Sequence, residues 1–106
     1  MKTIPRIAVF ASGSGSNAQR IAEYFSDKGV LEIAAIYCNN PDAFVLERAK
    51  LLGIPSVLFN RDTFYHSDAI LANLKNREVD WIILAGFLWL IPTNILAEFP
   101  GRIINI

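Results

Sequence analysis

Arg6-Ile-Ala-Val-Phe-Ala-Ser-Gly-Ser-Gly-Ser-Asn17 joins an uninterrupted apolar run to a loop of small residues. A continuous apolar run, in contrast to an alternating one, is typical of a strand that is covered on both faces. The segment after the loop is amphipathic, with apolar residues at helical spacing at positions Ala18, Ile21, Ala22 and Phe25. A strand, a glycine loop and a helix in this order predict the first unit of a parallel α/β sheet.

The same alternation continues along the chain. Further strands are expected at residues 31–38, 56–59, 80–85 and 102–106. Asp42 is the expected N-cap of the second helix, and Gly53 its C-terminal residue. Asp62 is the expected N-cap of a single third helix that runs to Leu74, and Pro92 is expected in the first turn of a fourth. This order predicts an open, mainly parallel, Rossmann-like sheet with helices on both faces, which binds ligands beyond the carboxyl ends of its strands.

Composition narrows the classes of function. Ten basic and ten acidic residues give a net charge of zero, whereas nucleic-acid-binding modules carry a basic surplus, so no nucleic-acid partner is expected. Cys38 and His66 stand alone, so we expect neither a disulfide framework nor a metal site. We interpret Cys38 as a buried small hydrophobe and His66 as a surface residue. Without a signal peptide or a long apolar run, the sequence predicts a cytoplasmic protein with no membrane contact.

The chain is more apolar than its size suggests. Hydrophobic residues make up 53% of the 106 residues, and the six glycines raise the share to about 59%, against roughly 45–50% in ordinary domains. Small domains should be more polar, because they have more surface for their volume. We therefore expect residues 1–106 to be an N-terminal phosphate-binding domain, truncated before a C-terminal half. An apolar surface left exposed in this way predicts self-association.

The glycine loop is the first candidate site. Gly13, Gly15 and Ala18 fit the pattern G-x-G-x-x-A, in which the backbone can approach an anion at a helix N-terminus. The alternative is a tight turn with no ligand. The second strand ends at Asn39-Asn40 without the acidic residue that holds a dinucleotide's ribose, and G-x-x-x-x-G-K does not occur. The loop therefore favours a phosphate monoester over a dinucleotide or a nucleoside triphosphate.

Two further features lie at strand ends. Leu84-Ala-Gly-Phe-Leu-Trp-Leu-Ile91 stays apolar where loops usually turn polar, and either packs in the core or shapes a slot for a flat ring at Gly86-Phe87. We favour core packing for Leu84 and Leu90. Asn105 is an amide in an apolar strand and is expected to be buried, where it either ties backbone groups together or donates to a ligand oxygen.

Taken together, these residues resemble the N-terminal half of the phosphoribosylglycinamide formyltransferase family. The resemblance spans essentially the whole chain and rests on five stretches in the family's order: Gly13-Ser-Gly-Ser-Asn17, Asn40-Pro-Asp-Ala-Phe44 with Leu46-Glu-Arg-Ala49, Gly53-Ile-Pro55, Leu84-Ala-Gly-Phe87 and Arg102-Ile-Ile-Asn-Ile106. It implies formyl transfer from 10-formyltetrahydrofolate to the amine of glycinamide ribonucleotide, in purine biosynthesis and without a metal. The glycine loop separates this family from sister formyltransferases that share the Asn-Ile strand end.

The resemblance also implies roles for individual residues. Gly15, Ser16 and Asn17 would hold the substrate's 5′-phosphate. Leu88, Trp89, Leu90 and Ile91, together with Asn105, would contact folate. Asn105 would be catalytic, because its side-chain N–H would stabilise the oxyanion that forms when the amine attacks the formyl carbon.

Two departures and one gap qualify this assignment. The family often has Arg at the position of Trp89, so the folate contacts there are expected to differ. Ser67 stands where an Arg can contact folate in the family, and that role is not carried over. The family's catalytic His and a later Asp fall outside residues 1–106, so this chain alone is expected to be inactive. The alternative from another class is a non-catalytic phosphate- or nucleotide-binding α/β module.

Overall fold

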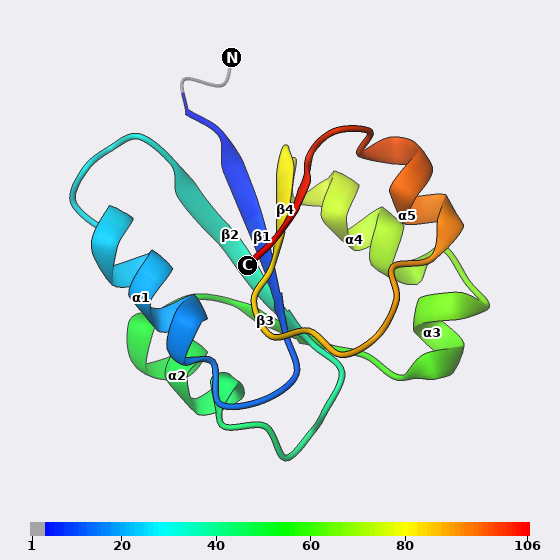
Figure 1. Ribbon diagram of the computed structural model, residues 1–106, viewed down its shortest axis with the longest axis horizontal. Coiled ribbons are helices and arrows are strands. Elements are labelled where there is room, and N and C mark those ends of the chain that lie inside the picture. Colours follow the sequence, from blue (N-terminus) through cyan, green and yellow to red (C-terminus); the bar gives the residue numbers. More distant parts are fainter. Residues whose placement is uncertain (1–3) are drawn as a thin grey trace.

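The computed structural model describes residues 4–106 and forms one five-stranded, all-parallel sheet (Figure 1). The strand order is β3-β2-β1-β4-β5. The strands are β1 (Arg6–Ala11), β2 (Glu32–Cys38), β3 (Ser56–Leu58), β4 (Trp81–Leu84) and β5 (Ile103–Asn105). The helices are α1 (Ser16–Phe25), α2 (Val45–Leu52), α3 (Arg61–Tyr65), α4 (Ala69–Asn76) and α5 (Thr93–Glu98). The predicted open, parallel, Rossmann-like sheet is confirmed.

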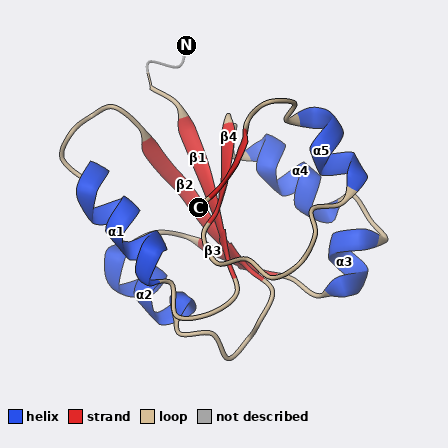
Figure 2. Cartoon of the chain, in the orientation of Figure 1, coloured by secondary structure: helices blue, strands red, loops and turns tan. Residues whose placement is uncertain are grey.

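Helices cover both faces of the sheet. Helices α1 and α2 lie on one face and α3, α4 and α5 on the other (Figure 2). Strand β1 explains why, because Ala8 and Phe10 belong to the core beneath α3–α5, while Ile7, Val9 and Ala11 belong to the core beneath α1 and α2. A strand with two apolar faces can be stable only when both are covered.

Two predicted helix boundaries were wrong. The N-cap of α2 is Phe44 and not Asp42, and no side chain caps that helix. The N-cap of α3 is Asn60 and not Asp62, because Asn60 and Thr63 exchange hydrogen bonds in a capping box. Gly53 does end α2 as predicted, in the left-handed conformation at φ 71°.

The expected single third helix is two helices, α3 and α4. Ser67 lies between them, where its hydroxyl donates to the carbonyl of Thr63 at 2.8 Å and accepts from the N–H of Ala69 at 3.2 Å. These bonds satisfy backbone groups in a turn and so compete with continuation of the helix.

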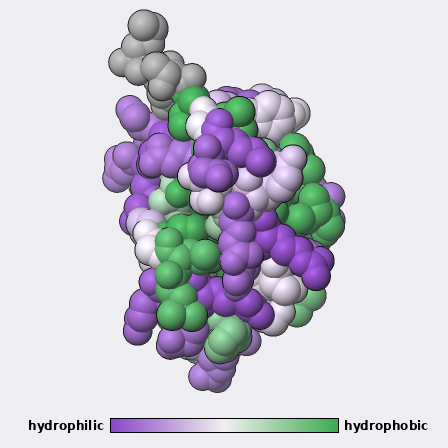
Figure 3. All heavy atoms as spheres, turned by 90° about the vertical axis from the view of Figure 1, so that its left-hand side faces the viewer, coloured by the Kyte–Doolittle hydropathy of each residue, from purple (hydrophilic) through white to green (hydrophobic). Residues whose placement is uncertain are grey.

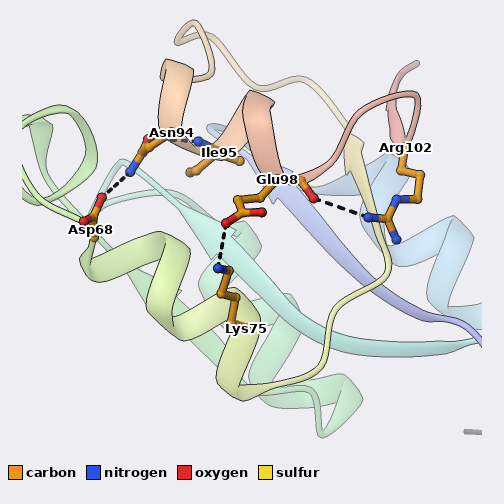
Figure 4. Close-up of polar contacts among 6 residues, drawn as sticks. All are labelled: Asp68, Lys75, Asn94, Ile95, Glu98 and Arg102. Carbon is orange, nitrogen blue, oxygen red and sulfur yellow. Dashed lines mark hydrogen bonds and ion pairs between the residues drawn. The ribbon is translucent and has the colours of Figure 1, made fainter.

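Polar contacts join α4 to α5 (Figure 4). Lys75 and Glu98 form an ion pair at 2.7 Å, and Asn94 donates to the Asp68 carboxylate at 2.8 Å. The ion pair is about half exposed on both sides, so it contributes under about 1 kcal/mol. The attachment matters because α5 follows directly after the apolar segment of residues 84–91.

The surface carries hydrophobic side chains on the face of α1 and α2, among hydrophilic ones (Figure 3). Leu51 on α2 is 81% exposed, and Phe44 at the start of that helix and Val30 after α1 are also exposed. Self-association through such a surface stays a prediction. No helix within residues 4–106 is long and apolar enough to cross a bilayer.

Tyr37 is a buried residue of β2 that makes a polar contact with α4. Its hydroxyl donates to Asn73 Oδ1 at 2.7 Å, and Arg77 Nε donates to the same oxygen at 3.0 Å. Burial raises the pKa of Tyr37 from 10.0 to about 12, with small opposing contributions from Arg77 and Arg6. The neutral hydroxyl is therefore part of the folded core.

Stability should fall above pH 10 because of Tyr37. Between pH 10 and about pH 12 the unfolded chain loses the phenolic proton while the folded chain keeps it, so unfolding becomes easier by up to about 3 kcal/mol. Tyr37→Phe should cost about 1 kcal/mol at neutral pH and remove this part of the alkaline slope. Urea unfolding of both chains from pH 8 to 12 measures the difference. A difference that stays constant with pH would contradict the assignment.

Candidate active site

The loops after β1 and β4 meet at the point where the helical connections switch from one face of the sheet to the other. β1 and β4 are neighbours, but the chain leaves β1 for α1 on one face and β4 for α5 on the other. Ligands of doubly wound sheets bind at such switch points. The N–H of Ser12 donates to the carbonyl of Gly86 at 3.3 Å, and the N–H of Leu88 donates to the buried Ser12 hydroxyl at 3.0 Å. The two loops are therefore held together.

The glycine loop opens α1. Gly15 is the N-cap, in the left-handed conformation at φ 77°, and no side chain caps the helix. The N–H groups of Ser16, Asn17 and Ala18 lie in the first turn and have no acceptor inside the helix. Acidic residues are also missing from this turn. The arrangement is suited to an anion, because the partial positive charge of the helix end is left unneutralised.

A pocket of about 100 Å³ lies at this loop. Residues Gly13 to Asn17 line it, together with Ala85 and Gly86 from the loop after β4. The loop carbonyls are already used, since Gly13 O accepts from the N–H of Val45 at 3.1 Å and Gly15 O from the N–H of Gln19 at 2.9 Å. These two backbone acceptors already have donors, whereas the N–H groups at the start of α1 have no acceptor inside the helix.

Close packing against α2 also requires a glycine at position 15. A Cβ at this position would lie 2.3 Å from Val45 Cγ2 and 2.9 Å from the Val45 Cα. A side chain at this position would therefore collide with α2, whether or not it also reached the space of an anion.

Asn105 lies at the same edge of the sheet. It pairs with Leu84 on β4, and Leu84 pairs with Phe10 on β1, so the three residues form one row across the strands. At a strand spacing of about 4.8 Å, Asn105 is about 10 Å from the end of β1. The expectation that its amide is buried was wrong, because β5 is the edge strand and Asn105 is exposed.

The apolar segment after β4 alternates in direction. Phe87, Trp89 and Ile91 pack against the core beneath α3–α5, whereas Leu88 and Leu90 are 83% and 85% exposed. Core packing is therefore wrong for Leu90, although its carbonyl accepts from the Tyr65 hydroxyl at 2.6 Å. The four predicted folate residues of this segment therefore present two different faces, and Asn105, the fifth, lies on β5.

Trp89 lines a larger pocket of about 460 Å³, at the ends of β2 and β3. The Arg61 guanidinium lies 4.4 Å from the centre of the Trp89 indole ring, and the ring also contacts Phe59 and Phe64. Asn39 Oδ1 is buried at this pocket, with no hydrogen-bond partner among residues 4–106. A cation therefore lies beside Trp89, where sequence patterns alone gave no indication of one.

The remaining candidates stay outside the site. Cys38 is fully buried, and burial raises the pKa of its thiol, so the reactive thiolate is disfavoured. His66 is exposed at the end of α3, as predicted. In the part of the chain that the structure describes, no group of three or more His, Cys, Asp or Glu side chains could hold a metal ion.

The sheet, its switch point and the pocket at the glycine loop define a Rossmann-like fold with a candidate ligand site. The chain belongs to the formyl transferase family, whose model matches residues 5–106. The resemblance to phosphoribosylglycinamide formyltransferase is confirmed by relatives of that name. The Bacillus subtilis protein is 38% identical over 95% of this chain, and the chloroplastic protein of Arabidopsis thaliana is 36% identical over 95% of it.

Solved structures agree with these relatives. Glycinamide ribonucleotide transformylase 1 from Geobacillus kaustophilus matches 96% of this chain with a TM-score of 0.87 and 38% identity. Phosphoribosylglycinamide formyltransferase from Brucella melitensis matches 97% with a TM-score of 0.89 and 34% identity. This chain covers 57% and 56% of those two chains and 54% of the Bacillus subtilis protein, about half of each, and 37% of the Arabidopsis thaliana protein.

Proposed function

We propose that this chain is the phosphate-binding half of an enzyme that transfers a formyl group from 10-formyltetrahydrofolate to the amine of glycinamide ribonucleotide. The observation that carries the proposal is the donor-rich glycine loop at the switch point of a formyl transferase sheet. Gly15, Ser16 and Asn17 hold the 5′-phosphate through backbone N–H groups and short side chains. The absence of an acidic residue at the end of β2 fits a monoester better than a dinucleotide.

The chemistry takes place at the end of β5, two strands away from β1. The amine nitrogen attacks the formyl carbon, and the carbonyl oxygen becomes an oxyanion that accepts a hydrogen bond from the Asn105 side chain. The bond to the folate nitrogen then breaks, and the formyl group stays on the amine. The separation of about 10 Å between the ends of β1 and β5 is compatible with a ribose and a glycinamide group lying between phosphate and reacting amine.

Folate binding is assigned to residues 88–91 and Asn105. Ser12 fixes the start of this segment through the N–H of Leu88, and Tyr65 fixes Leu90 through its carbonyl. Exposed Leu88 and Leu90 provide apolar surface for a flat ring, while Trp89 and Ile91 anchor the segment in the core. The proton transfers, and the remaining contacts to both substrates, are assigned to the family's C-terminal half. The cytoplasmic location also stays a prediction.

Calorimetry with residues 1–106 tests the phosphate site. Glycinamide ribonucleotide should bind, and the same compound without its 5′-phosphate should bind at least about tenfold more weakly, since charge-assisted hydrogen bonds to the phosphate are lost. NAD should show no comparable binding. Equal affinity for the phosphorylated and unphosphorylated compounds would contradict the assignment, and tight NAD binding would favour the alternative, a non-catalytic nucleotide-binding module.

A further inference from the structure

Arg48 on α2 reaches across to the glycine loop. Its Nε donates to the carbonyl of Ser14 at 2.6 Å, and its Nη1 donates to Oε1 of Gln19 on α1. Its guanidinium also lies 5.0 Å from the centre of the Phe44 ring. One side chain therefore connects three elements: the loop, the helix that the loop opens, and the neighbouring helix.

These contacts complete a pattern in the loop carbonyls. The carbonyl of Gly13 accepts from the N–H of Val45 on α2, and that of Ser14 accepts from Arg48. The carbonyl of Gly15 accepts from the N–H of Gln19 within α1. Three successive carbonyls of the loop therefore already accept hydrogen bonds from the protein. A loop whose carbonyls were free to turn would expose partial negative charge to an anion, and would lose entropy when the anion ordered it.

Arg48 uses its donors on neutral oxygens. Within residues 4–106, no carboxylate lies within ion-pair distance of its guanidinium, whereas Arg6 pairs with Glu32 and Lys75 with Glu98. The planar guanidinium can bond two differently placed oxygens at once, and a lysine ammonium on its single stem is poorly suited to do so. The geometry here depends on the shape of the arginine side chain as well as on its charge.

We propose that Arg48 is a positioning residue of the anion site: it fixes Ser14 and Gln19 so that the loop presents N–H groups to a phosphate. The inference rests on the proposed phosphate site and adds to it a residue that need not touch the ligand. It assigns to α2 the task of preorganising the loop.

The test measures the affinity of residues 1–106 for ribose 5-phosphate and inorganic phosphate by calorimetry. Arg48→Met keeps the stem and removes both donors, Arg48→Lys keeps the charge, and Gln19→Met breaks one contact without changing charge. Lys50→Met is the matched control, because Lys50 is an exposed cation on the same helix. Arg48→Met should weaken phosphate binding about tenfold, Arg48→Lys about fivefold and Gln19→Met about threefold, each by loss of one or two hydrogen bonds. Lys50→Met should stay within about twofold of the parent, since a screened surface charge has little effect.

Melting temperatures and loop amide exchange separate positioning from unfolding. The inference predicts weaker binding and faster exchange at Gly15 and Ser16 in variants whose melting temperature stays close to that of the parent. If Arg48→Met does not fold, Arg48→Lys and Gln19→Met carry the test. Parental affinity in Arg48→Lys, with a loss only in Arg48→Met, would assign the effect to charge and overturn the inference. If the parent binds phosphate and all Arg48 and Gln19 variants bind it with the same affinity, the role of Arg48 is overturned and the phosphate site stands. If the parent does not bind, the phosphate site is overturned as well.

Discussion

Asn105→Ala should lower turnover about 100- to 1,000-fold in a full-length protein that carries this chain, which is the typical effect of removing one oxyanion donor. The Kd of glycinamide ribonucleotide should stay within about twofold, because phosphate affinity is assigned to Gly15, Ser16 and Asn17 at the end of another strand. Steady-state kinetics give the first quantity and calorimetry the second. A fall in kcat without a change in the Kd of glycinamide ribonucleotide is expected of a group that stabilises the oxyanion and does not hold the phosphate.

Asn76→Ala is the matched control for this experiment. Asn76 is an exposed amide at the end of α4, away from the carboxyl edge of the sheet, and its removal should leave kcat unchanged.

Residues 1–106 without a C-terminal half should show no detectable transfer, because positioned proton transfer and substrate orientation are assigned to that half. Full activity of Asn105→Ala, or turnover by the isolated chain, would refute the proposed roles.

Gly15→Ala should destabilise the fold by about 2–5 kcal/mol. The backbone at φ 77° disfavours any side chain, and the new Cβ would overlap Val45, so conformational strain and overpacking add together. Gly13→Ala makes the same chemical change two residues earlier. A Cβ there meets no atom within 4 Å, and the φ of Gly13 is not positive, so the cost should be below about 1 kcal/mol.

Chemical unfolding of both variants measures this contrast. Gly13 also lines the pocket of the proposed phosphate site, so Gly13→Ala tests ligand access in a chain whose stability is close to that of the parent. Gly15→Val would both overlap Val45 and fill space in the pocket. Its main measured effect should therefore be a loss of stability and not a loss of affinity. Equal stabilities of Gly15→Ala and Gly13→Ala would contradict the contact between the loop and α2.

Local patterns predicted much of the fold. The two-faced burial of β1 follows from its continuous apolar run, and the end of α2 follows from Gly53, since both depend on neighbouring residues alone. The break between α3 and α4 depends on the hydroxyl of Ser67 bonding to backbone groups on either side. Helical spacing of apolar residues continues through such a turn, so periodicity alone does not reveal it.

Sequence patterns predicted only the part of the candidate site whose residues are adjacent in the chain. The glycine loop could be found because its residues are contiguous. The hydrogen bonds that join Ser12 to Gly86 and Leu88 depend on β1 lying beside β4. Predicting the strands along the sequence does not give their order in the sheet. Arg48 donates a hydrogen bond to Ser14, which is 34 residues away in the sequence. The sequence pointed to Arg48 only through its place in the family stretch Leu46-Glu-Arg-Ala49. Asn105 was expected to be buried because an apolar strand does not reveal that it is an edge strand.

An amide chemical-shift titration of residues 1–106 with glycinamide ribonucleotide tests the central claim most directly. The account predicts that the largest shifts occur at Gly15, Ser16 and Asn17, with smaller ones at Gly86, and that inorganic phosphate reproduces those at the loop. The N–H groups at the start of α1 should move because they become donors to the phosphate. Saturable binding with shifts confined to the ends of β2 and β3, or no shift at residues 13–17, would contradict it.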